Sequence, residues 1–146
     1  RDNKVLEPTG TRLITKDDLI KLKDQFFPTQ FQVYTEKKYE IRVFVWLNDI
    51  YAMAIFSQGN EQTKVDFRNY DSDKQNRSIS YFLPNDIIKK LKLFMKKLNL
   101  STGSFDLIMD VNDRYVFLEV NTTGQFGMVS KPCNYYIEKK IAENLV

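Results

Sequence analysis

The clearest pattern along the chain is a pair of apolar stretches, residues 105–110 and 115–121, separated by Asn112 and Asp113. Both stretches are rich in aromatic and β-branched residues, and Asn-Asp is turn chemistry, so the pattern predicts a β-hairpin. A two-residue loop at Asn112 and Asp113 sets Val111 opposite Arg114. Counting back pairs residue 109 with 116, 107 with 118 and 105 with 120, so one face of the hairpin is apolar throughout.

The other face of the same hairpin carries an acidic pair. The register pairs Ile108 with Phe117 and sets Asp106 directly opposite Glu119, where like charges destabilise a sheet. Asn121 points to the same face two residues further on. Two carboxylates and an amide oxygen are hard ligands that suit Mg²⁺, which phosphates and water typically complete. The pattern favours a magnesium–nucleotide site; the alternative is a solvated Asp106 with Glu119 paired to a lysine.

Alternation of apolar and polar residues predicts a second hairpin, from residues 39–47 and 50–57 with a turn at Asn48-Asp49. One face of its first strand holds residues 41, 43, 45 and 47, and the other holds residues 40, 42, 44 and 46. Arg42 is the only cation in the middle of that strand. A half-buried arginine needs a charged partner, so we expect either a carboxylate or a phosphate beside it, with equal weight.

The rest of the pattern predicts helices at residues 16–26, 85–98 and 132–145, and short strands at 31–34 and 80–83. Thr15 and Asp18 are placed to cap the first helix, and Pro28 ends it. Residues 58–77 are polar and predict a mobile surface loop, and residues 122–131 predict a further loop. This order indicates an α+β domain, a mainly antiparallel sheet backed by helices on one side.

Composition narrows the function classes. The 146 residues suffice for one domain, and no apolar run reaches the ~18 residues of a membrane helix. The chain has no histidine, which excludes Ser-His and Cys-His nucleophiles and histidine zinc sites, and its single Cys133 is compatible with a reducing cytoplasm. The lysines of residues 89–97 fit the solvated face of a helix better than a nucleic-acid site. We expect a cytoplasmic protein, and Arg1 in place of Met suggests a fragment.

Four stretches carry a resemblance to a known family: FPTQFQVY at 27–34, EIRVFVW at 40–46, VDFR at 65–68 and FDLIMDVNDRYVFLEVNTTGQFG at 105–127. Together they resemble the C-terminal half of an ATP-grasp ligase, most closely the graspetide peptide maturases of the grasp-with-spasm and microviridin type. The resemblance implies that residues 1–146 are a C-terminal ATP-grasp domain, an α+β subdomain without the N-terminal domain and most of the central subdomain. Such a fragment is expected to be inactive alone. Thr122 departs from the family, which often has proline there.

The resemblance also implies an activity. ATP and Mg²⁺ would serve to activate a side-chain carboxylate of a precursor peptide as an acyl-phosphate, which a hydroxyl or lysine amine of that peptide attacks to form an ω-ester or ω-amide. By the resemblance, Asp106, Glu119 and Asn121 would be metal ligands. Nucleotide contacts would come from Gln32 and Val33 on a hinge strand and from Leu118 against the base. Arg42 would steady the transferred phosphoryl group, and Arg68 would lie near the acceptor, bordered by the loop of residues 123–127.

Other functions stay open at this point. The hairpin does not distinguish a peptide maturase from an amino-acid ligase of the glutathione-synthetase-like kind. A non-catalytic peptide-binding module is the alternative outside the enzymes. The partners we expect are a precursor peptide and, as a further case, a second copy of the chain in a homodimer, with no nucleic acid and no membrane.

Overall fold

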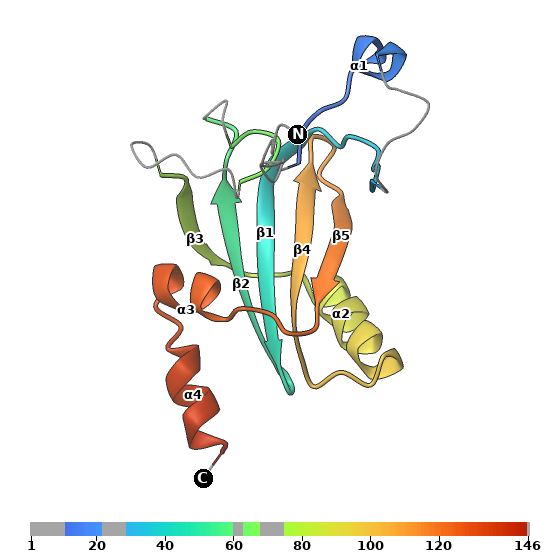
Figure 1. Ribbon diagram of the computed structural model, residues 1–146. Coiled ribbons are helices and arrows are strands. Elements are labelled where there is room, and N and C mark those ends of the chain that lie inside the picture. The colour runs from blue at the N-terminus through green and yellow to red at the C-terminus, as the bar shows by residue number, and fades with distance from the viewer. Residues whose placement is uncertain (1–10, 22–28, 60–62, 68–74, 146) are drawn as a thin grey trace, which may run out of the picture.

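The computed structural model describes residues 11–21, 29–59, 63–67 and 75–145. Within these residues the strands form one antiparallel sheet in the order β3-β2-β1-β4-β5 (Figure 1). The elements are α1 (Lys16–Ile20), β1 (Lys37–Trp46), β2 (Asp49–Phe56), β3 (Arg77–Tyr81), α2 (Asn85–Lys97), β4 (Thr102–Asp110), β5 (Tyr115–Asn121), α3 (Gly127–Cys133) and α4 (Ile137–Glu143). The α+β class with a mainly antiparallel sheet is confirmed.

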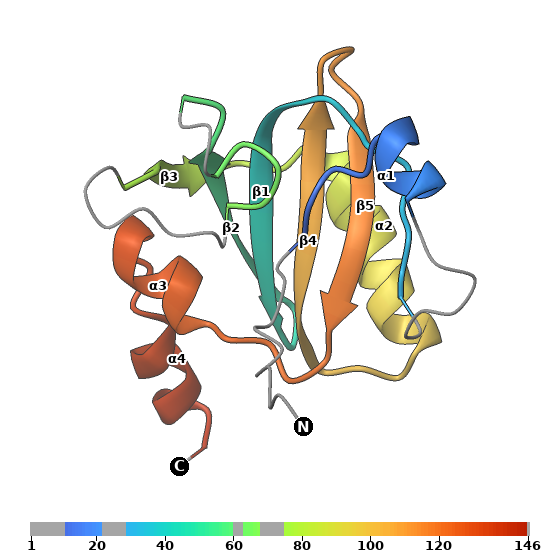
Figure 2. The same cartoon turned by 45° about the horizontal axis from the view of Figure 1, so that its top comes forward.

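The sheet separates two hydrophobic cores, one on each face. Ile41, Val43 and Val45 of β1 pack with α2, whereas Phe44 of the same strand packs with Val129 of α3 and with the start of α4. Figure 2 shows α2 behind the sheet, with α3 and α4 in front of it. The expectation of helices on one side only was therefore wrong, because Phe44 and Trp46 make the second face of β1 apolar near its end, where α3 and α4 cover it.

The β1–β2 hairpin forms as predicted, but its turn lies one residue earlier. Trp46 pairs with Asp49, so the turn residues are Leu47 and Asn48 rather than Asn48 and Asp49. Leu47 has a φ of 54° and is solvent-exposed, so it does not continue the apolar face of the strand. A left-handed residue suits the twist of a two-residue hairpin turn.

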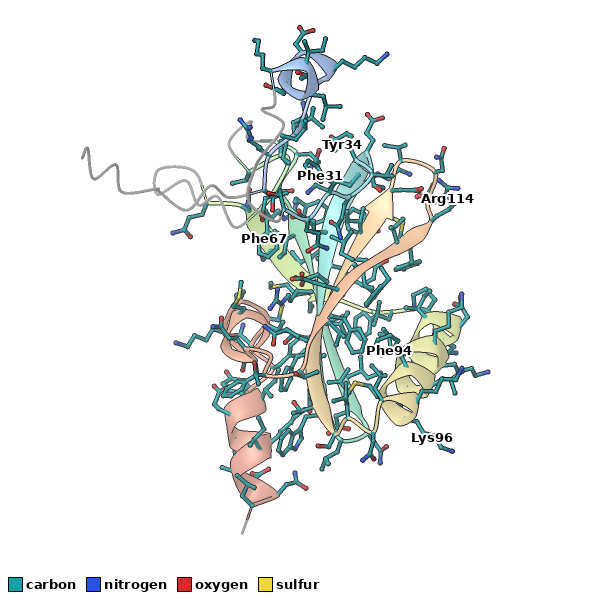
Figure 3. All side chains as sticks on the ribbon, turned by 45° about the vertical axis from the view of Figure 1, so that its right-hand side comes forward. Phe31, Tyr34, Phe67, Phe94, Lys96 and Arg114 are labelled. Carbon is teal, nitrogen blue, oxygen red and sulfur yellow. The ribbon has the colours of Figure 1, made fainter. Side chains whose placement is uncertain are left out.

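Helix α2 matches its predicted span to within one residue. Its buried residues are Ile87, Leu91 and Met95, whereas Leu98, the last residue of the predicted span, is exposed just beyond the helix. Phe94 faces the sheet and makes ring contacts with Phe105 and Phe117 at centroid distances of 5.5 and 5.6 Å (Figure 3). The helix therefore secures the β4–β5 hairpin from behind.

The β4–β5 hairpin contains two irregularities that the sequence did not reveal. Its loop has three residues, because Asp110 and Arg114 face each other, and Asp113 is left-handed with a φ of 61°. This moves the pairs near the loop by one residue, so the predicted pairs 109–116, 107–118 and 108–117 are wrong. A bulge at Leu118 restores the original register, and Phe105–Val120 and Asp106–Glu119 pair as predicted.

The C-terminal region differs most from expectation. Residues 122–131 were predicted to be a loop, but α3 begins at Gly127, and the helix predicted from Pro132 to Leu145 is instead the end of α3 followed by α4. Asn134 and Tyr136 between them are both left-handed, with φ of 53°. Val129 and Ile137 are fully buried, so tertiary packing sets this arrangement rather than local propensity.

The N-terminal predictions hold in part. Thr15 and Asp18 form the expected capping box of α1, but the helix ends at Ile20, and residues 22–26 of the predicted helix lie outside the described residues. Residues 31–34 form no strand. In the polar segment 58–77, the described residues 63, 66 and 67 are buried rather than at the surface. Across the described chain no helix is both long and apolar enough to cross a membrane.

Candidate active site

A pocket of about 680 Å³ opens on the α3 face of the sheet, over β1, β4 and β5. Its floor is formed by Glu40, Arg42, Asp106 and Glu119, and its walls come from residues 11–14, 29–35 and 65–67. Figure 3 shows Phe31, Tyr34 and Phe67 at the same end of the sheet, two of them from the segment before β1 and one from the loop after β2. Segments far apart in sequence thus converge around a polar floor.

An ion pair between Arg42 and Asp106 lies at the centre of that floor. The two residues are directly paired across β1 and β4, and Arg42 Nη1 donates to both carboxylate oxygens of Asp106 at 2.8 Å. The side chains of Arg42 and Asp106 are only 9% and 14% exposed. Of the two partners predicted for Arg42, the structure shows the carboxylate. Arg42 Nε is buried without a partner in the described chain, which leaves one donor uncommitted.

Glu119 faces Asp106 from β5, as the hairpin register predicted. Burial raises the pKa of the Asp106 carboxyl above its ordinary value; Arg42 lowers that pKa, and Glu119 raises it further. Glu119 itself is solvent-exposed. The positive charge of Arg42 therefore offsets the repulsion between two carboxylates that a sheet alone would not tolerate.

A second buried ion pair stands beside the first. Lys37 Nζ contacts Glu40 Oε1 and donates to the backbone oxygen of Val65 at 2.9 Å. Lys37 and Glu40 are each 6% exposed. Burial raises the pKa of the Glu40 carboxyl, and Lys37 and then Ser57 lower it in part. Glu40 Oε2 is buried and makes no hydrogen bond within the described residues.

Lys37 was not among the predicted site residues, because the sequence pattern indicated the orientation of its partner Glu40 but not that of Lys37 itself. Alternation placed Glu40 on the same face as Arg42, which is where the structure has it. Lys37 should point to the opposite face by period two, but the β1–β4 register shifts between Lys37 and Tyr39. That irregularity turns the lysine toward Glu40, and no residue pattern announces it.

Asn121 ends β5 and begins a turn. Its Oδ1 accepts hydrogen bonds from the backbone nitrogen and the hydroxyl of Thr123, both at 3.0 Å. Gly124 then passes so close to β4 that a Cβ there would lie 2.1 Å from Ser104 Oγ. Ser104 is two residues from Asp106 on the same strand, so the loop passes β4 at this position.

The residues proposed to contact a nucleotide also meet at this pocket. Gln32, Val33 and Leu118 all line it, with Val33 92% exposed at its rim. The bulge at Leu118 is what brings both Leu118 and Glu119 to the pocket side of β5. Arg68 lies outside the described residues, although Val65, Asp66 and Phe67, which precede it, line the pocket wall.

The donor set fits a hard divalent cation only with help from other ligands. Among the described residues no three acidic, cysteine or histidine side chains gather in one place. A metal at Asp106 and Glu119 would have two carboxylates, and it would gain Asn121 Oδ1 if that oxygen released Thr123. Mg²⁺ is commonly bound by one or two carboxylates together with phosphates and water, so the residues present are sufficient.

Comparison with known proteins gives a consistent result. No protein-family model and no curated protein matches the chain. Among solved structures, it matches the macrocyclase MdnC from Microcystis aeruginosa MRC bound with the precursor peptide MdnA, at 36% identity and a TM-score of 0.71 over 90% of this chain and 41% of that one. The macrocyclase MdnB of the same organism matches at 30% identity and a TM-score of 0.62, over 80% and 40% of the two chains.

A third structure is a Chryseobacterium gregarium RiPP-associated ATP-grasp ligase in complex with ADP and a leader and core peptide. It matches at 34% identity and a TM-score of 0.60, over 63% of this chain and 28% of that one. The chain therefore spans less than half the length of each of these proteins. Its fold and sequence are similar to part of the RiPP-associated ATP-grasp ligases and macrocyclases, which confirms the resemblance noted from the sequence.

Proposed function

We propose that this chain is the nucleotide- and metal-binding C-terminal part of an ATP-dependent carboxylate ligase that crosslinks a ribosomally made peptide. The observation that carries the proposal is the floor of the pocket, where Asp106, Glu119 and Arg42 adjoin. It gains support from the solved relatives, which were crystallised with ADP in one case and with peptides in two. The whole activity requires the rest of the ligase, so we expect this chain alone to be inactive.

The proposed roles follow the positions of the residues around the pocket. The backbone and side chains of Gln32 and Val33 would contact the adenine on one wall, and Leu118 would pack against the base from β5. Asp106 and Glu119, together with Asn121, would hold Mg²⁺, which supplies positive charge to the nucleotide phosphates. Residues 65–67 form the opposite wall, next to which Arg68 would meet the peptide.

The chemistry would run in two displacements. A peptide carboxylate attacks the γ-phosphorus of ATP, a P–O bond to ADP breaks, and an acyl-phosphate forms. A hydroxyl or amine of the peptide then attacks the acyl carbon; the C–O bond to phosphate breaks, and the proton of the nucleophile passes to the phosphate or to water. Arg42, whose side chain lies in the floor of the pocket, would stabilise charge on the transferred group. No protein nucleophile is needed, which agrees with a chain that has no histidine.

Calorimetry of ATP or ADP with Mg²⁺ tests the proposal on the complete ligase. We expect Asp106→Ala and Glu119→Ala each to abolish measurable metal-dependent binding. Asp86→Ala is a matched control, because Asp86 is an exposed acid on α2 that forms a long ion pair of 3.9 Å with the exposed Lys90. Binding that survives both pocket variants, in protein shown to be folded, would contradict the proposed site.

A non-catalytic peptide-binding module is the second candidate, and one observation favours it. The pocket rim carries exposed apolar side chains, among them Leu13, Phe31, Val33 and Tyr34, which a peptide could cover. This reading predicts peptide binding that does not depend on nucleotide and is unaffected by Asp106→Ala. Titrating a precursor peptide into the complete protein with and without ATP and Mg²⁺ separates the two functions.

A further inference from the structure

The pocket wall formed by residues 65–67 is connected to β1 through a buried lysine. Lys37 is the first residue of β1, and it reaches across to the loop after β2, where its Nζ donates to Val65 O at 2.9 Å. The same nitrogen contacts Glu40, so a single ammonium joins the floor of the pocket to its wall. Lys37 is 6% exposed, which makes this one of the few buried cations in the described chain.

Other contacts hold the same wall at its base and its tip. Thr63 Oγ1 donates to Ser57 O at 3.1 Å, and Gln58 Nε2 donates to Lys64 O at 3.1 Å. Phe67 is buried in the core beneath α3. Between these two anchors Lys37 binds the backbone at Val65, the residue that precedes Asp66.

We propose that Lys37 is a positioning residue for the peptide side of the pocket. The inference rests on the proposed function, in which residues 65–67 border the peptide and Arg68 follows them directly in sequence. Lys37 fixes this wall at a set distance from the floor, so that the peptide carboxylate meets the phosphoryl group held by Arg42. Its effect passes through the backbone of Val65, and Lys37 itself touches no substrate.

A purely structural ion pair would not need this geometry. Two buried charges can often be replaced by apolar side chains with little or no loss of stability, because both have been removed from water at a cost. The hydrogen bond to Val65 O is the additional feature. Through it the Lys37 ammonium, which already contacts Glu40, also binds a loop that is not part of the sheet. Removing both charges therefore separates a structural role from a positioning role, because the domain should stay stable while the hydrogen bond from residue 37 to Val65 O is lost.

Hydrogen exchange of the complete ligase, followed by mass spectrometry, reads the wall directly and needs no catalysis. We compare the wild type with Lys37→Met and with the double variant Lys37→Met/Glu40→Gln, which leaves no unpaired buried charge. The expected result is at least tenfold faster exchange in a fragment that spans residues 63–67, with unchanged exchange in β4. Lys90→Met, which alters an exposed lysine on α2, is the matched control and should change neither fragment.

Kinetics at saturating ATP supply a second reading. The double variant should raise the KM for the precursor peptide five- to tenfold, whereas Lys37→Arg, which can still reach both Glu40 and Val65, should restore much of the wild-type value. Unchanged exchange at residues 63–67 would overturn the inference, and so would equal acceleration across the sheet, which would mean a loss of global stability. If the wild-type ligase forms no crosslink at all, the proposed function fails, while the exchange result still decides the role of Lys37.

Discussion

The Arg42–Asp106 ion pair yields the sharpest quantitative prediction for this fold. The perturbation is Arg42→Met, which keeps most of the apolar stem of the side chain and removes its charge. Arg42 Nη1 is 2.8 Å from both oxygens of Asp106. At that separation and an effective dielectric constant of about 20, the Coulomb attraction is about 6 kcal/mol, most of it offset by the desolvation of both groups.

The net cost depends on what the variant leaves behind. Without Arg42, the Asp106 carboxylate remains mostly buried and directly opposite Glu119, whose repulsion at ~5 Å is about 3 kcal/mol before solvent screens the exposed Glu119. Removing one partner of a buried pair typically costs about 3–5 kcal/mol, so we expect Arg42→Met to lower the free energy of unfolding by about 3 kcal/mol. Asp106→Asn leaves the arginine unpaired but relieves the repulsion, so its cost should be smaller, about 1–2 kcal/mol.

Urea unfolding of this chain, followed by circular dichroism, measures these values as a double-mutant cycle. The double variant Arg42→Met/Asp106→Asn should be less destabilised than the sum of the single variants by about 2 kcal/mol, because the second change removes the uncompensated charge. Additive costs within about 0.5 kcal/mol would refute the reasoning, since they would mean that the two side chains do not interact in solution. Lys38→Met serves as the control, because the Lys38–Asp113 pair is exposed and should contribute little.

Three further predictions test the supports of the site. Asp110 accepts hydrogen bonds from the backbone and the side chain of Arg114. These bonds, the backbone bond most of all, hold the pKa of the Asp110 carboxyl below its ordinary value of 3.8. The stability that the Asp110 carboxylate contributes is therefore complete above pH 3.8 and is lost as the pH falls through the folded-state pKa. Asp110→Asn should lower the melting temperature at neutral pH, and the difference from wild type should shrink below pH 3.8. Gly124→Ala would force a Cβ to 2.1 Å from Ser104 Oγ, so calorimetric unfolding should show a loss of about 1–3 kcal/mol. Phe94→Ala should cost about 3 kcal/mol in urea unfolding, because it removes the ring that joins α2 to the hairpin.

Each of these has a control and a contradicting outcome. For Asp110, a melting-temperature difference that is constant down to pH 2 would show that its charge is not involved. For Gly124, Ser104→Ala should give no rescue, because Ser104 Cβ and N would also lie 2.5 Å away, and full rescue would place the strain wrongly. For Phe94, the exposed Lys96 on the same helix should tolerate alanine, and an equal loss at both positions would argue against the aromatic cluster.

The pairing of Asp106 with Glu119 could be predicted from the sequence, but only because two errors in the assumed register cancel. The assumed two-residue loop was wrong by one position, and the bulge at Leu118 shifts the register back by one. The longer loop comes from interactions outside the strand pattern, because the Asp110 carboxylate accepts hydrogen bonds from the backbone nitrogens of residues 112 and 114. Period-two alternation contains no information about either, so the nearer pairs were lost and the farther ones were kept.

The second wall of the pocket could not be predicted for a related reason. Thr63 and Asp66 in this segment are polar in sequence yet buried in the fold, where Thr63 donates to the backbone oxygen of Ser57 and Lys37 donates to that of Val65. Burial of polar side chains that donate to backbone oxygens leaves no hydrophobic pattern in the sequence. In the same way α3 forms where glycine, threonine and serine suggested a loop, since a fully buried Val129 anchors it.

Core residues and pocket residues alternate along β1, and this affects which substitutions the domain can accept. Val43 and Val45 pack with the α2 side of the sheet, whereas the pocket floor lies on the opposite face. Glu40 and Arg42, on the opposite face, have ion-pair partners that fix their positions. Stability and the proposed chemistry therefore depend on different positions of one strand, so an exchange of valine for isoleucine at position 43 or 45 can alter the core while the ion pairs of the pocket floor keep their partners.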